Sequence, residues 1–66
     1  MDRIYDASSY AKGDRVRVEI GGEEQVCTVT KVLRHHNRLQ VASPFGYGFT
    51  VDLTKSEEVG RKIERV

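Results

Sequence analysis

The fold of this protein is decided by residues 12–22, whose sequence is KGDRVRVEIGG. Residues 15–20 alternate strictly between charged and apolar side chains, so the three apolar ones share one face. A period of two is the pattern of a β-strand with one buried face. Lys12-Gly13-Asp14 before this strand is a turn signal, and Gly21-Gly22 after it can adopt the positive φ values of a tight hairpin.

The chain after this hairpin predicts four more strands, at residues 25–33, 38–42, 47–53 and 61–66. In the first of them the apolar positions Cys27 and Val29 are followed by Val32 after a skip of three. A change of phase inside a strand indicates a bulge or a sharp bend, which small barrels need at their corners.

Turn and helix signals separate the later strands. Arg34-His35-His36-Asn37 contains no apolar residue and ends in Asn, which tolerates left-handed geometry, so it is expected to be a hairpin tip. Ser43-Pro44-Phe45-Gly46 fits a type I turn. Thr54-Lys55-Ser56-Glu57 has the pattern of a capping box, and Gly60 suits a helix C-cap, which together predict one turn of 3₁₀-helix before the last strand.

A chain of 66 residues forms one small domain and buries only about 60% of the surface of its unfolded state. We expect an extended arm over residues 1–11 and a barrel over residues 12–66, with no volume for a deep pocket. A homo-oligomer that shares apolar surface is compatible with so small a core. The expected core comprises twelve side chains: Val16, Val18, Ile20, Val29, Val32, Leu39, Val41, Phe49, Val51, Leu53, Val59 and Ile63.

The order of these elements, four hairpin-connected strands, a helical turn and a short last strand, is that of an SH3-like barrel. Residues 12–18, KGDRVRV, resemble the K-G-D-x-V-x-V entry strand of bacterial SH3-like, Tudor-like and KOW-type domains. Residues 27–32 resemble their second strand, with Cys27 where glycine is commoner. The resemblance implies an all-β, five-stranded SH3-like barrel. It also implies a module that offers loop residues to RNA, DNA or a polymerase.

The amino-acid composition limits the classes of protein to which this chain is expected to belong. Eleven Lys and Arg against ten Asp and Glu give a net charge of +1, so overall charge does not mark a nucleic-acid binder. One cysteine cannot form a disulfide within its own chain, which favours a reducing, cytoplasmic location. No apolar run is long enough to span a membrane, and residues 1–6 lack the apolar region of a signal peptide, so no membrane partner is expected.

The distribution of charge is more informative than its sum. Residues 25–51 contain three cations and no acid, and the glycine-rich segment with Phe45 and Tyr47 is expected to lie close to these cations in the fold. Cations bind phosphates and aromatic faces stack on unpaired bases, so this combination predicts a site for RNA or single-stranded DNA. Histidines add charge at mildly acidic pH. The expected nucleic-acid-binding residues are Lys31, Arg34, His35, His36, Arg38, Phe45 and Tyr47.

Other interpretations of these residues stay open. The same surface fits a protein–protein adaptor or an accessory subunit bound to a larger protein, and the near-neutral net charge favours this alternative. It also fits a solvated hairpin tip with two rings that cover the mouth of a barrel. An aromatic cage for a methylated amine needs three or four rings around one point, and the core already claims Phe49.

No enzyme, cofactor or metal site is expected. Adjacent His35 and His36 point to opposite faces of a strand, and Cys27 among β-branched residues fits a small core side chain. The plasmid-borne type II dihydrofolate reductases are SH3-like tetramers whose entry strand is similar to residues 13–17. Their pore-lining V-Q-I-Y falls on residues 50–53, TVDL, which hold neither Gln nor Tyr, so that activity does not carry over.

Overall fold

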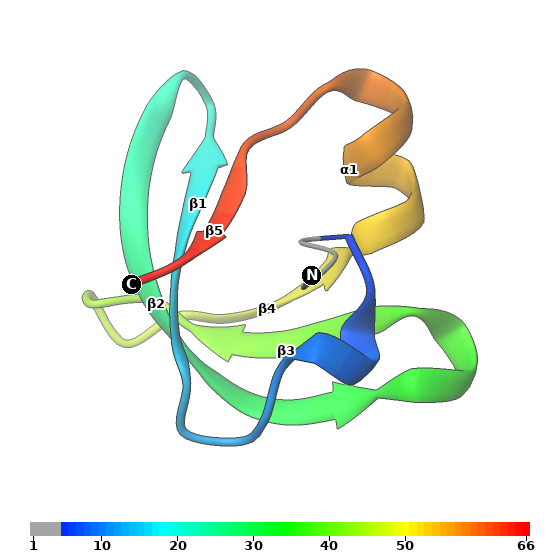
Figure 1. Ribbon diagram of the computed structural model, residues 1–66. Coiled ribbons are helices and arrows are strands. Elements are labelled where there is room, and N and C mark those ends of the chain that lie inside the picture. The colour runs from blue at the N-terminus through cyan, green and yellow to red at the C-terminus, as the bar shows by residue number, and fades with distance from the viewer. Residues whose placement is uncertain (1–4) are drawn as a thin grey trace.

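The computed structural model describes residues 5–66 as a single bent antiparallel sheet of five strands with one short α-helix (Figure 1). The sheet order is β4-β3-β2-β1-β5. The elements along the chain are η1 (Ala7–Ser9), β1 (Arg15–Ile20), β2 (Glu23–Leu33), η2 (Arg34–His36), β3 (Arg38–Ala42), β4 (Gly48–Asp52), α1 (Leu53–Val59) and β5 (Ile63–Arg65). The predicted all-β class and the order of elements are therefore confirmed.

The first hairpin forms where the two glycines predict it. Gly21 and Gly22 have φ values of 58° and 85°, and Ile20 pairs directly with Glu23. These φ values lie in the left-handed region, where side chains with a Cβ are strained. The glycine pair therefore sets the register in which Val16 and Val18 face the core.

The long strand β2 belongs to both halves of the sheet. Its first part pairs with β1 and its second part with β3, and Figure 1 shows the strand curving between the two. The register shifts between Val29 and Lys31, which confirms the bulge predicted from the skip of three. Because of this extra residue, Val32 pairs with Leu39 on the core side.

The sheet does not close in this structure, because β4 and β5 remain its two edge strands. What is shown is a bent five-stranded antiparallel sheet; the SH3-like barrel that we expected is not confirmed by strand pairing. The helix α1 connects the two edges (Figure 1), and Leu53 at its start is fully buried.

The core agrees with expectation at eight of the twelve positions and differs at the others. Ile20, Val32 and Phe49 are only half-buried against it, and Val59 is 61% exposed, so its assignment to the core is wrong. Val59 lies in the last helical turn, whereas α1 buries Leu53 and Ser56. The buried core comprises Ala7, Tyr10, Val16, Val18, Cys27, Val29, Leu39, Val41, Val51, Leu53 and Ile63.

The helix differs from the predicted 3₁₀ turn in length and in its cap. It is an α-helix of seven residues, and its N-cap is Asp52, whose side chain accepts a hydrogen bond from the Lys55 N–H at 3.1 Å. Thr54 and Glu57 therefore do not form the expected capping box. The prediction for Gly60 is confirmed, since it ends the helix with a φ of 71°.

The N-terminal segment is also more ordered than the extended arm that we expected over residues 1–11. Residues 1–4 lie outside the described part of the chain, but Ala7 and Tyr10 are buried in the core and η1 lies between Asp6 and Tyr10. The Arg65 guanidinium lies over the Tyr10 ring, 5.4 Å from its centroid. Two isolated anchor residues give no periodic signal, which is why the sequence pattern missed them.

Candidate nucleic-acid interface

The tip of the β2–β3 hairpin is exposed and basic. Arg34, His35 and His36 form η2 and all three are exposed. Asn37 ends this turn in the left-handed region with a φ of 52°, as expected for an Asn at this position. The tip therefore presents one guanidinium and two imidazoles to solvent without burying any of them.

The Asn37 side chain fixes the base of this tip. Its Oδ1 accepts from the Ala7 N–H at 2.8 Å, and its Nδ2 donates to the Tyr5 carbonyl and to the Thr54 Oγ1, each at 3.0 Å. The Leu53 N–H also donates to the Asn37 carbonyl at 3.0 Å. One residue thus connects the hairpin to the N-terminal segment and to α1.

The bulge in β2 decides where Lys31 lies. Lys31 pairs with Gln40, one position away from the core-facing Val32–Leu39 pair, and it is exposed. The Thr30 Oγ1 donates to the Gln40 carbonyl at 3.1 Å. If the same residues formed a regular strand without the bulge, strict alternation from Val29 would direct Lys31 toward the core.

Arg38 is the least available of the expected cations. Its Nε lies 3.3 Å from the Asp52 Oδ2, across the β3–β4 pair. The hydrogen bond from the Lys55 N–H is the main cause that lowers the pKa of Asp52; burial opposes it as the next largest effect, and Arg38 lowers the pKa further. Arg38 therefore has a carboxylate partner that a phosphate would have to displace.

Phe45 and Tyr47 do not lie beside the basic tip, and that part of the prediction is wrong. The tip precedes β3 and the aromatic loop follows it, so the two loops lie at opposite ends of the strand (Figure 1). Five extended residues separate them by about 17 Å at roughly 3.3 Å per residue. The rings cannot stack on bases whose phosphates contact the tip residues in the way we expected.

Two further cations, Lys12 and Arg15, lie on the Lys31 side of the hairpin. Counting the charges within residues 25–51 did not include them. The Gly13 N–H donates to the Val29 carbonyl and the Val29 N–H donates to the Asp14 carbonyl, each at 2.8 Å, so residues 12–14 lie along β2 beside its bulge. Arg15 pairs with Thr28. Lys12 and Arg15 are both exposed and thus approach Lys31 from the other side of β2.

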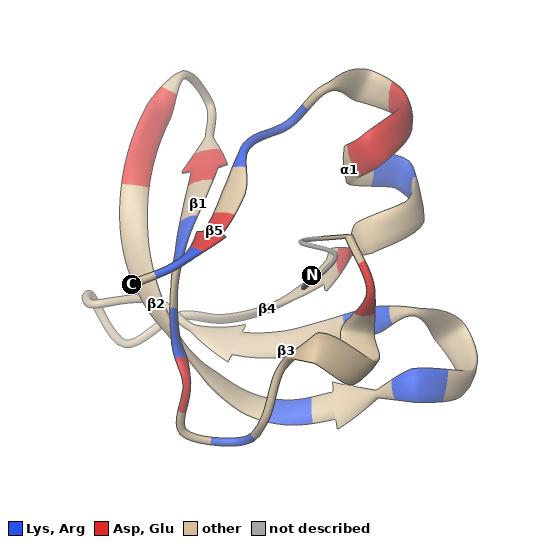
Figure 2. Ribbon diagram, viewed as in Figure 1, with Lys and Arg blue, Asp and Glu red and all other residues tan. Residues whose placement is uncertain are grey.

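We define the basic face as Lys12, Arg15, Lys31 and Arg34, with His35, His36 and Arg38 at the tip. Within residues 5–66, the first four have no ion-pair partner. The nearby Asp14 is already engaged, with its Oδ2 3.6 Å from the Arg65 Nε. Figure 2 shows the blue segments of the β2–β3 hairpin well apart from the red segments of the β1–β2 hairpin.

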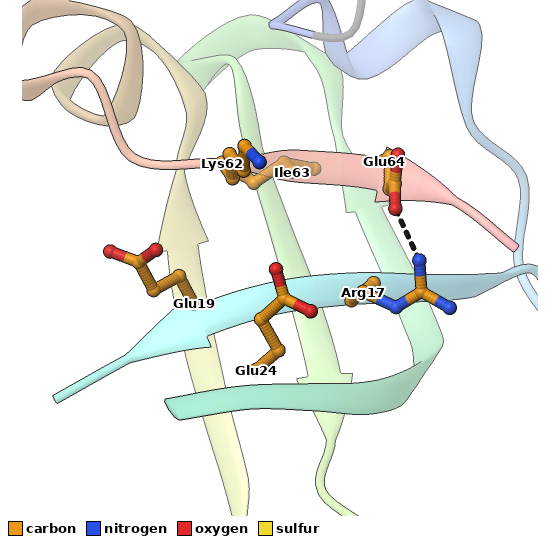
Figure 3. Close-up of a pocket in the computed structure, with 6 residues that line it drawn as sticks. All are labelled: Arg17, Glu19, Glu24, Lys62, Ile63 and Glu64. Carbon is orange, nitrogen blue, oxygen red and sulfur yellow. Dashed lines mark hydrogen bonds and ion pairs between the residues drawn. The ribbon is translucent and has the colours of Figure 1, made fainter. Parts of the chain in front are cut away.

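The opposite end of the sheet is acidic. Glu19, Glu23 and Glu24 flank the glycine turn, and all three are exposed. A groove of about 230 Å³ lies beside them, and Figure 3 shows Glu19 and Glu24 on neighbouring strands at this groove, with Lys62 just before β5 and Glu64 within it. Arg17 in this groove forms an ion pair with Glu64. Although the net charge of the chain is close to zero, the β2–β3 hairpin is basic and the β1–β2 hairpin is acidic.

The remaining reactive groups are not arranged as a reaction centre in the described part of the chain. Cys27 is a free, buried thiol whose pKa is raised by burial, which disfavours the nucleophilic thiolate. Among residues 5–66, no three His, Cys, Asp or Glu side chains gather closely enough to hold a metal ion.

Comparison of the chain with known protein families, curated proteins and solved structures finds no match. The helices within residues 5–66 also lack the length and apolar character needed to cross a bilayer.

Proposed function

We propose that this protein is a non-enzymatic binding module that contacts nucleic acid through the phosphates along its basic face. The observation that carries the proposal is the gathering of four exposed cations that have no ion-pair partner among residues 5–66. They are contributed by β2, the turn before β1, the first residue of β1 and the hairpin tip. Phosphate contacts position a protein on nucleic acid and are independent of base sequence. The expected ligand is therefore RNA or DNA bound without strong sequence preference.

The same proposal includes an SH3-like arrangement of the strands. The hairpin connections, the bulged β2 and the helix between β4 and β5 support it, as do the two stretches that resemble SH3-like, Tudor-like and KOW-type domains. In such an arrangement Lys12, Arg15, Lys31 and Arg34 are exposed, which leaves the cations accessible to an extended phosphate backbone.

The binding can be tested by titrating the protein with mixed-sequence oligonucleotides at several salt concentrations. If four cations each meet a phosphate, the slope of log affinity against log salt is about −2.8 for a single strand and about −3.6 for a duplex. Amide shifts should concentrate on residues 12–15 and 30–38. Absence of shifts at low salt, or shifts confined to residues 43–47, would refute a phosphate-binding basic face.

A protein–protein adaptor is the second candidate function, and two exposed aromatic rings support it. Phe45 and Tyr47 are 74% and 71% exposed, although aromatic rings of this size are usually at least partly covered. Because these rings lie far from the basic face, the two functions do not compete for the same residues.

A further inference from the structure

We propose that the aromatic end of the sheet docks an extended, cationic segment of a partner protein that supplies an apolar anchor side chain. The aromatic end consists of Phe45 and Tyr47, the half-buried Ile20 and Phe49 beneath them, and Glu23 at the rim. This site is separate from the basic face and does not depend on the function proposed for it.

The apolar part of the site is a shallow groove of about 250 Å³. Its lining combines the two exposed rings with Ile20 from β1 and Phe49 from β4, and it contains no Lys or Arg. Exposed aromatic rings next to a hydrophobic depression are typical of the anchor points of protein interfaces, where Tyr and Trp carry much of the binding energy. A single apolar side chain is the occupant that suits such a groove.

The loop that carries the rings is held in one conformation by Ser43. The Ser43 Oγ accepts from the Phe45 N–H at 3.2 Å and from the Tyr47 N–H at 3.1 Å. The Ser43 carbonyl accepts from the Gly46 N–H, and the Ser43 N–H donates to the Tyr47 carbonyl at 2.7 Å. Gly46 has a φ of 91°, which favours glycine there. A preorganised loop loses little entropy on binding, so the rings are presented ready to bind.

The charge around the groove selects the partner. Glu23 lies directly across from Ile20, which lines the groove, so the two side chains share one face of the hairpin, whereas Glu19 and Glu24 form the next pair and face the other groove beside Lys62. Within residues 5–66 the Glu23 carboxylate has no ion-pair partner. A carboxylate at this position repels nucleic-acid phosphates and anionic lipid surfaces, and it attracts Lys or Arg. A cationic protein segment satisfies both the groove and its rim.

The probe for this site is a pair of short synthetic peptides that share the same leucines, one with lysines and the other with glutamates at the remaining positions. We expect the lysine peptide to shift the ring resonances of Phe45 and Tyr47 and the amides of residues 20–25. The variants F45A and Y47A should each weaken its binding by at least about fivefold, as truncation of an energetically important interface residue does. E23Q should weaken it less and reduce its salt dependence.

Matched controls separate this site from general stickiness. V59A removes another exposed apolar side chain and E57Q removes an acid from α1, and neither should change the affinity for the lysine peptide. Equal binding of the glutamate peptide, or no shift of the ring resonances, overturns the proposal. Ring shifts that depend on protein concentration without peptide would instead identify a second copy of this chain as the occupant, and would also overturn it.

Discussion

Replacing Asn37 should strongly destabilise the protein although this residue is only partly buried. Asn37→Ala removes the two partly buried hydrogen bonds to Ala7 and Tyr5, which are each worth about 0.5–1.5 kcal/mol. It also places a Cβ-bearing residue without a compensating side chain at a φ of 52°, at roughly 1–2 kcal/mol. The sum is about 2–5 kcal/mol.

This loss is large compared with the expected unfolding free energy of the protein. A chain of this length is expected to have an unfolding free energy of about 3–10 kcal/mol, from roughly 0.05–0.15 kcal/mol per residue. Asn37→Gly provides the matched variant, because glycine accepts the left-handed backbone but makes no side-chain hydrogen bonds. We therefore expect Asn37→Gly to be less destabilised than Asn37→Ala by about 1 kcal/mol.

Urea denaturation followed by circular dichroism measures the unfolding free energy of both variants. An m value equal to that of the parent would show that the variants expose the same surface on unfolding. An unfolding free energy of Asn37→Ala within about 0.5 kcal/mol of the parent value would refute the reasoning, because differences of that size are ordinary for surface substitutions. If Asn37→Gly were as unstable as Asn37→Ala, the hydrogen bonds alone would account for the effect and the argument from φ would be wrong.

Three further predictions test the basic face, the helix cap and the core. Lys12→Ala and Arg15→Ala should each make the salt slope of oligonucleotide binding less steep by about 0.7–0.9, whereas Lys55→Ala on α1 should leave it unchanged. Asp52→Ala should lower stability at neutral pH and Glu57→Gln should not. Because the folded-state pKa of Asp52 is lowered, its contribution is present above the ordinary value of 3.8 and is lost as the pH falls through the folded-state pKa, so the parent and Asp52→Ala curves should converge in acid. Leu39→Ala should cost about 2–5 kcal/mol in thermal or urea unfolding, while Val59→Ala should stay within about 0.5 kcal/mol of the parent.

The strands were predictable because each carries its own local pattern. The bounds of β3 are those that the sequence predicts, and the bulge in β2 follows from the spacing of Val29 and Val32. The helix cap was ambiguous, since Asp52 and Thr54 are both good caps and two residues apart. The fold selects Asp52 because Leu53 has to enter the helix with its side chain in the core.

The candidate site was less predictable, because it depends on which strands pair. Lys12 and Arg15 join Lys31 only through the β1–β2 ladder, and a count along the chain does not contain this information. The placement of Phe45 and Tyr47 was accessible from topology alone. Any loop that follows a strand lies at the opposite end from the loop that precedes it, so their distance from Arg34 follows from the order of the elements.

The bulge at Val29–Lys31 also bears on how this chain tolerates insertions and deletions. Deleting Thr30 would restore a regular alternation in which Lys31 stays outward and Val32 stays inward, whereas deleting Thr28 would make the inward-facing Cys27 and Val29 adjacent and force one of them outward. A one-residue deletion is therefore compatible with the pattern of β2 at the bulge and damaging elsewhere in the strand. Any library of variants built on this scaffold should keep the length of β2 constant outside the bulge and vary only the identities of its outward-facing residues.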